Sequence, residues 1–217
     1  MSSQTHQIEN NPALMLEAPK VKQSLPKHLT LEDSLELLNS VDGNNKQRDY
    51  CILVLFLNCG LRLAELCSLN LSSISSDNTL TVVGKGNKER VVYLNNACME
   101  ALRAYLEVRP NDGIPVTEKN ALFISRNHRR ISPKTVQHIV KTYLEKSGLG
   151  GQGFSTHKLR HTAATLMYQH GDVDIRVLKD ILGHANLGTT QIYTHVSDKQ
   201  IKHAVDQNPL SNVKLKK

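Results

Sequence analysis

The longest apolar run of the chain, "YCILVLFLNCGL" at residues 50–61, constrains the fold more than any other segment. It is shorter than the roughly 18 apolar residues that a membrane span needs, and it has the length of a buried helix. Apolar residues on every side of a helix indicate that other elements enclose it. We therefore expect a buried helix over about residues 45–58, with Gly60 just after its end and Arg62 opening a short further helix.

Other helices are expected where capping residues precede apolar positions at helical spacing. The start signals are Thr30 with Asp33, Asn95, and Ser132 before Pro133. The last two helices should end near Arg109 and Ser147. Helices are also expected over residues 154–171 and 174–183, followed by a short turn at 189–196. A final helix should open at Ser197 and carry Ile201, Ala204 and Val205 on one side.

Strand signals are few. The stretch "TLTVVGKGNKERVVYL", residues 79–94, alternates in polarity and can turn through Gly84 and Gly86, which predicts a β-hairpin. "ALFIS", residues 121–125, predicts a short strand, and the basic turn "RNHRR" follows it. The expected fold class is mainly α with a small antiparallel β-sheet (α+β).

Charge narrows the possible partners. Lys and Arg number 27 against 20 Asp and Glu, a net charge of +7, which favours a polyanionic partner such as nucleic acid. Aromatic residues make up 4% of the chain and Trp is absent, which argues against a platform that stacks single-stranded bases and favours contact with a duplex backbone. The four cysteines form no C-x-x-C pair, and the N-terminus lacks the features of a signal peptide. We expect reduced thiols in a cytoplasmic protein without a membrane partner.

The stretch "FSTHKLRHTAATL", residues 154–166, places His157, Arg160 and His161 on one face of an expected helix. Taken alone, they could form a polar seam or part of a metal site. The H-E-x-x-H pattern of metalloproteases would need Glu at position 158, where Lys158 stands, and Arg160 would repel a cation. No metal site is expected.

Five segments taken together carry a resemblance: "GLRLAEL", "GKGNKER", "HKLRH", "LGH" and "TTQIYTH". In this order and at these separations the chain resembles the tyrosine site-specific recombinases, of Xer-like and phage-integrase type, over about residues 20–205. The resemblance implies the fold of a recombinase catalytic domain. It also implies cleavage and rejoining of DNA strands through a 3′-phosphotyrosyl intermediate, without cofactor, metal or ATP.

Matching the family motifs residue by residue implies a set of site residues. The catalytic positions would be Arg62, Lys85, His157, Arg160, His184 and Tyr193. Tyr193 would be the nucleophile, the two arginines would hold the phosphate oxygens, and Lys85 would be the acid for the departing 5′-oxygen. Glu65, one turn past Arg62, would orient a guanidinium group. His161 would support the site without taking part in the chemistry.

The implied partner is double-stranded DNA with a specific recombination site, bound by a homotetramer that holds two duplexes. The residues expected to contact DNA are Lys88, Arg90, Arg126, Arg129, Arg130 and Lys134. Substitution of Arg160 by Ala is expected to abolish cleavage while leaving duplex binding mostly intact.

The expected organisation has three parts. Residues 1–26 read as a linker or cut end that follows an absent N-terminal DNA-binding domain. Residues 27–196 form the catalytic domain. Residues 197–217 form a helix and tail, which would dock onto a neighbouring protomer or, alternatively, onto their own domain.

Two other functional classes remain open at this point. A type IB topoisomerase would share the fold and the Arg-Lys-Arg-His-Tyr set, but would relax supercoils without a preferred site. A DNA-binding accessory factor without catalysis would bind duplexes and form no covalent adduct.

Overall fold

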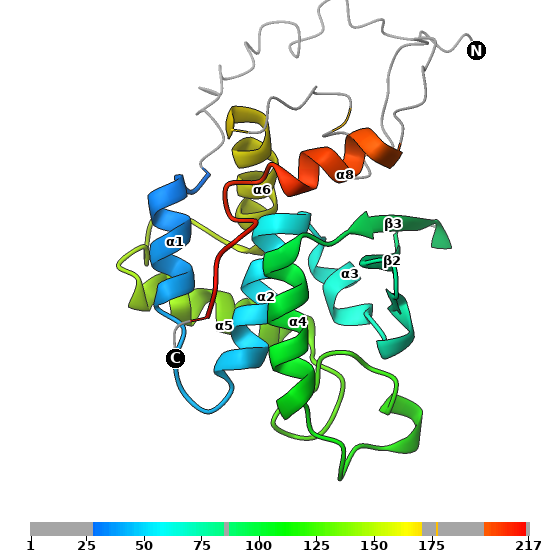
Figure 1. The fold of residues 1–217 in the computed structure, drawn as a ribbon. Helices are drawn as coiled ribbons and strands as arrows, with labels where there is room; N and C mark the ends of the chain where they lie inside the picture. Colours follow the sequence, from blue (N-terminus) through cyan, green and yellow to red (C-terminus); the bar gives the residue numbers. More distant parts are fainter. Residues whose placement is uncertain (1–27, 85–86, 171–176, 178–197, 216–217) are drawn as a thin grey trace, which may run out of the picture.

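A computed structural model describes residues 28–84, 87–170, 177 and 198–215, and shows a helical domain built around one central helix. This is α2, Lys46–Cys59, in which every residue from Arg48 to Cys59 is buried. Helices α1 (Leu31–Asn39), α4 (Asn96–Val108), α5 (Pro133–Lys146) and α6 (Thr156–His170) all contact it (Figure 1). The apolar run at residues 50–61 is therefore the centre of the core, as expected.

Most helix boundaries follow the local signals. Thr30 and Asp33 form a capping box at the start of α1, and the side chains of Asn95 and Ser132 cap α4 and α5. Helix α2 ends at Gly60 in the left-handed conformation, with φ of 58°. The short helix α3, Leu63–Ser68, follows at once with Arg62 as its N-cap residue.

The sheet has three antiparallel strands in the order β1-β2-β3. Strand β1 is Ile74–Ser75, and β2 (Thr79–Val83) pairs with β3 (Glu89–Tyr93) as the expected hairpin, with Thr79 opposite Tyr93 and Val83 opposite Glu89. Two short 3₁₀ helices, Leu71–Ser73 and Val116–Glu118, lie in the connections. The expected fold class, mainly α with a small antiparallel sheet, is confirmed for the described residues.

The strand expected at residues 121–125 is wrong. Ala121, Leu122, Phe123 and Ile124 are buried, but only isolated bridges form, between Asn70 and Ala121 and between Ile124 and Arg130. Side chains from other elements take the place of a neighbouring strand. The hydroxyl of Tyr105 donates to the carbonyl of Leu122 and accepts from the N–H of Ile124, while Arg109 donates to the carbonyls of Ala121 and Leu122.

The last described helix, α8 (Asp198–Asp206), packs on its own chain. Ala204 and Val205 are buried in a cluster with Ala163 and Met167 of α6, and Ile201 is half-buried beside it. The expected apolar stripe therefore has a partner within the chain. Docking onto a neighbouring protomer stays a prediction.

The segment after α8, residues 207–215, is named here the C-terminal strap. It runs from the end of α8 down along α2 and α4 (Figure 1). The side chain of Asn208 donates to the carbonyl of Leu57 at 3.1 Å, and the N–H of Ala97 donates to the carbonyl of Ser211 at 2.8 Å. Leu210 is fully buried in the main core. The strap is thus an integral part of the domain.

Within these described residues, no helix combines the length and apolar character needed to cross a membrane.

Candidate active site

Arg62 lies in the short connection between the end of α2 and the start of α3. The left-handed turn at Gly60 terminates α2, and the buried Leu61 anchors the connection before Arg62 caps α3. Only glycine adopts this conformation without a steric cost, so the sharp change of direction depends on Gly60. The Arg62 side chain remains 39% exposed.

Arg160 comes from α6 and points toward the same place. Its NH1 group donates to the carbonyl oxygen of Gly60, and its side chain is only 6% exposed. That carbonyl belongs to the end of α2, where backbone acceptors lack partners within the helix. Arg160 therefore satisfies the end of the central helix and is held beside Arg62 at the same time.

Glu65 lies at the centre of a cluster of three arginines, Arg62, Arg90 and Arg160. Its side chain is 2% exposed, and its Oε1 accepts from NH1 of Arg62 at 2.7 Å. Its Oε2 accepts from the backbone N–H of Arg62 at 2.8 Å and from NH2 of Arg90 at 2.9 Å. NH1 of Arg160 lies 4.0 Å from the same oxygen. Glu65 therefore contacts the guanidinium groups of both Arg62 and Arg90, and its role in orienting a guanidinium for catalysis stays a prediction.

Burial and the charges within this cluster shift the pKa values of Glu65 and Arg160. Burial alone would raise the pKa of Glu65, but the hydrogen bond from the Arg62 backbone and the positive charges of Arg90 and Arg62 hold that pKa below its ordinary value. Burial, together with the charge of Arg62, lowers the pKa of Arg160 to about 10. Both groups are therefore charged at neutral pH, and positive charge is in excess around the single carboxylate.

The two histidines of α6, His157 and His161, are close to Arg160 along the helix and contact each other. Nε2 of His161 is 3.1 Å from Nε2 of His157, and the rings meet edge to face with centroids 4.6 Å apart. In such a contact one nitrogen donates and the other accepts, so each ring fixes the proton position of the other. His157 is exposed and His161 half-buried, which leaves His157 accessible to a ligand.

Three expected catalytic residues, Lys85, His184 and Tyr193, lie outside the described residues. The same is true of the expected turn at 189–196, of residues 1–27, and of the expected helix at 174–183 except for Val177, which is helical and buried. Lys85 follows directly after Gly84, the residue that closes the described part of the hairpin turn with an N–H to Lys88 carbonyl bond of 2.8 Å. The structure thus brings Arg62 and Arg160 together around Glu65, and it pairs His157 with His161 on α6, the helix that carries Arg160.

The expected DNA-contacting residues divide into two groups. The side chains of Lys88, Arg126, Arg129 and Lys134 are exposed. Arg130 instead donates to the carbonyls of Cys67 and Leu69 and to Oδ1 of Asn70, so it braces the end of α3. Arg90 is 17% exposed and faces Glu65. We therefore leave Arg130 and Arg90 out of the proposed DNA-contacting surface.

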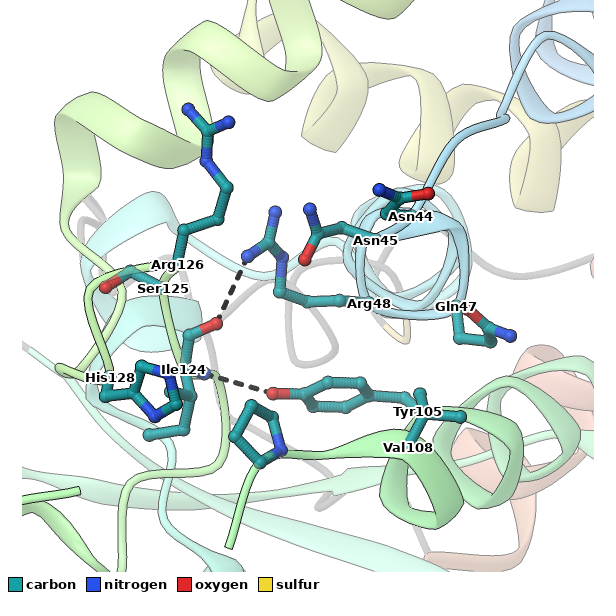
Figure 2. Close-up of a pocket in the computed structure, with 11 residues that line it drawn as sticks. Asn44, Asn45, Gln47, Arg48, Tyr105, Val108, Ile124, Ser125, Arg126 and His128 are labelled. Carbon is teal, nitrogen blue, oxygen red and sulfur yellow. Dashed lines mark hydrogen bonds between the residues drawn. The ribbon is translucent and has the colours of Figure 1, made fainter. Parts of the chain in front are cut away.

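A separate hollow of about 230 Å³ lies at the opposite end of α2 (Figure 2). Arg48 and Arg126 both line it, but Arg48 is paired with Asp49 at 2.8 Å and donates to the carbonyl of Ile124 at 3.2 Å. Helix α2 has 14 residues and is about 21 Å long, so this pocket is distant from Arg62. The charge of Arg48 is therefore compensated by Asp49 within the domain.

Residues 27–200 match the phage integrase family, a span that contains the whole arginine cluster. The chain belongs to the phage integrase family. The match confirms the resemblance that the motifs carry. It extends through the expected positions His184 and Tyr193, whose structure is not described.

Individual family members agree with this assignment. The tyrosine recombinase XerC of Caldanaerobacter subterraneus subsp. tengcongensis is 57% identical over 204 residues, which cover 94% of this chain. The chain spans 57% of that relative's length. The crystal structure of XerA recombinase superposes with a TM-score of 0.68 at 30% identity, covering 89% of this chain and 67% of XerA, which confirms the expected fold.

A third relative was crystallised with its DNA. The post-cleavage complex of XerH site-specific recombinase with palindromic difH substrate matches with a TM-score of 0.65 at 25% identity, over 75% of this chain and 48% of XerH.

Sequence reasoning missed the partner of Arg90 in this family site. The residue was recognised as basic and placed in a hairpin, but its bond to Glu65 joins positions that are 25 residues apart. An alternating strand pattern identifies which residues share a face, and only the packing of the hairpin against α3 shows what that face meets.

Proposed function

We propose that this chain cleaves and rejoins DNA strands in site-specific recombination, through a covalent 3′-phosphotyrosyl link to Tyr193. The observation that carries the proposal is the meeting of Arg62 and Arg160, from two distant segments, around the buried Glu65. Guanidinium groups match the geometry of phosphate oxygens better than lysine does. The partial exposure of Arg62 supports a role in reaching a phosphate.

The reaction is a transesterification at phosphorus. The hydroxyl oxygen of Tyr193 attacks the scissile phosphate, a new P–O bond forms to Tyr193, and the bond to the 5′-oxygen breaks. Lys85 gives a proton to the departing 5′-oxygen, and the proton of Tyr193 passes to a base, for which His157 is the accessible candidate. One phosphoester bond replaces another, so the step needs neither ATP nor a metal.

The arginines supply the electrostatic part of catalysis. Negative charge grows on the non-bridging oxygens as the tyrosine attacks, and Arg62 and Arg160 hold it while remaining charged at neutral pH. In this proposal His184 donates to one of the same oxygens. The fixed position of Arg160 on the Gly60 carbonyl means that little reorganisation is needed when the substrate binds.

The proposed partner is a DNA duplex with a specific site. The XerH complex with difH substrate supports this, as do the exposed cations of the proposed DNA-contacting surface. That surface consists of Lys88, Arg126, Arg129 and Lys134. By family resemblance, four protomers would hold two duplexes.

The proposed catalytic domain is residues 27–196, and the family match over residues 27–200 supports these bounds. The four cysteines are buried free thiols, which supports a reducing, cytoplasmic location.

The test is to trap the covalent intermediate. The chain is incubated, in buffer containing a metal chelator, with nicked duplexes drawn from a randomised library, so that cleavage releases a short strand and religation fails. DNA that stays on the protein in SDS is recovered and sequenced. We expect enrichment of one sequence by the native chain, and no SDS-resistant adduct from Tyr193→Phe.

Two outcomes would overturn the proposal. Duplex binding without any adduct would favour an accessory factor. Adducts on all sequences alike, with relaxation of supercoiled plasmid, would favour a topoisomerase of type IB.

A further inference from the structure

Arg90 lies in strand β3 and is the third arginine around Glu65. Its NH2 group donates to Oε2 of Glu65 at 2.9 Å, and its side chain is 17% exposed. We propose that Arg90 is a positioning residue of this site. It acts through Glu65 to orient the Arg62 side chain and to leave the positive charge of Arg62 available for the phosphate. This inference rests on the proposed function.

The bonds of Glu65 show how Arg90 could orient Arg62. The oxygen Oε1 is left to the guanidinium of Arg62, while Oε2 is shared by the Arg62 backbone N–H and Arg90. Rotation of the carboxylate would break both bonds on Oε2. Arg90 therefore holds the plane of the carboxylate, and this plane directs the Arg62 guanidinium.

The positive charge of Arg90 is the second way in which this residue would act on Arg62. A lone Glu65 next to Arg62 would neutralise much of the charge that a phosphate needs. Arg90 occupies the other oxygen of the same carboxylate, so its charge offsets the carboxylate and leaves more of the Arg62 charge for the substrate. Arg62, 39% exposed, is better placed to reach the DNA than Arg90 at 17%.

The position of Arg90 also joins the hairpin to α3. Arg90 is opposite Val82 on β2, and a Cβ atom placed on Gly84 would lie 3.8 Å from Oε1 of Glu65. The base of the hairpin turn is therefore packed against the same carboxylate. The expected acid, Lys85, is the next residue after Gly84.

The first measurement compares Arg90→Gln with Arg90→Lys in single-turnover adduct formation on the selected nicked duplex. Val91→Thr is the matched control, because Val91 is the next residue of β3 and is exposed. We expect Arg90→Gln to slow adduct formation about 10- to 100-fold with little change in duplex affinity. Arg90→Lys, which keeps the charge but loses the planar fork, should be intermediate.

A second substrate separates positioning of the arginines from other roles. A methylphosphonate at the scissile linkage replaces one charged oxygen by a methyl group, so the cationic side chains matter less. The defect of Arg90→Gln should shrink on this substrate. It should also add little to the defect of Glu65→Gln, because both changes act on one unit. An equal defect on both linkages, or full additivity, would overturn the inference.

A third measurement needs no cleavage. In protein with ¹⁵N-labelled arginine, NMR reports rotation of the Arg62 guanidinium, which should become faster in Arg90→Gln and stay unchanged in Val91→Thr. If the native chain forms no adduct, the proposed function fails while this result still decides whether Arg90 orients Arg62. Unchanged rotation in Arg90→Gln would overturn the inference.

Discussion

Glu65 shows how a single buried carboxylate orders several cations. It is 2% exposed and has bonds to Arg62 and Arg90, with Arg160 at 4.0 Å. Removing one member of a buried ionic group leaves uncompensated charge, so we expect Glu65→Gln to lower the free energy of unfolding by about 3 kcal/mol at neutral pH. Urea unfolding gives this value. The exposed substitution Glu107→Gln should change it by less than about 0.5 kcal/mol.

The same residue predicts a pH dependence. Glu65 has an ordinary pKa of 4.5 and a lower one in the fold. Its contribution to stability is fully present above 4.5 and is lost as the pH falls through the lower native pKa. The difference in unfolding free energy between the native chain and Glu65→Gln should therefore be constant between about pH 7 and 5 and shrink in stronger acid. A difference that grew on acidification would contradict the assignment.

His161 provides a prediction about proton placement. Its Nε2 lies 3.1 Å from Nε2 of His157, so one of these nitrogens donates and the other accepts, and the proton positions of the two rings are linked. We expect His161→Leu to slow adduct formation about 10-fold, and His157→Leu to slow it by at least about 100-fold. Single-turnover rates on the selected duplex measure both effects. Equal losses for the two variants would show that His161 is itself a catalytic residue.

At the scale of elements, the C-terminal strap makes a prediction for stability. Leu210 is fully buried in the main core, although it follows the last described helix. Truncating a buried leucine leaves a cavity, so Leu210→Ala should lower the free energy of unfolding by about 3 kcal/mol. It should also expose α8 to protease, since the strap holds the end of that helix.

The control for this prediction is Lys214→Ala. Lys214 is exposed and has a surface ion pair with Glu100 at 3.7 Å. Such pairs contribute little, so the change in unfolding free energy should stay within about 0.5 kcal/mol. A Leu210→Ala variant as stable as this control would show that the strap is dispensable.

Elements with local signals were predictable from the sequence. The capping box of Thr30 and Asp33, the cap of Ser132 and the alternating hairpin each depend on residues a few positions apart. Arg62 and Arg160 are a different case: the family motifs, and not local spacing, predicted them as site residues, and the structure places both near Glu65. Local spacing suffices wherever the interaction that forms the element is itself local.

Elements defined by distant partners were not predictable in this way. The run "ALFIS" has the composition of a strand, yet Tyr105 and Arg109 satisfy its backbone in place of a ladder. The strap carries only one fully buried apolar residue, Leu210, and depends on contacts with α2 and α4. The bond between Arg90 and Glu65 likewise depends on how the hairpin packs on α3.

For the whole molecule, the charge distribution predicts strongly salt-dependent binding. The net charge is +7, and the proposed DNA-contacting surface contributes Lys88, Arg126, Arg129 and Lys134. Each neutralised phosphate adds about −0.9 to the slope of the logarithm of the DNA association constant against the logarithm of the salt concentration. If each of these four cations neutralises one phosphate, a slope of about −4 is expected. Fluorescence anisotropy of a labelled duplex across salt concentrations measures it.

One residue of that surface can be removed to check the slope. Arg129→Gln should make it shallower by about one unit, whereas Lys214→Gln should leave it unchanged. A slope near zero for the native chain would exclude backbone contacts as the source of affinity.

The C-terminal strap also has a consequence for folding of the chain during its synthesis on the ribosome. Asn208 bonds to Leu57, which is 151 positions earlier in the chain. The central helix is therefore made long before the residue that satisfies its carbonyl and the leucine that closes its core. Contacts of such long sequence separation form late and slowly. The contacts of Asn208 and Leu210 with the core can form only after residues 208–211 have left the ribosome, so until then this part of the core stays incomplete.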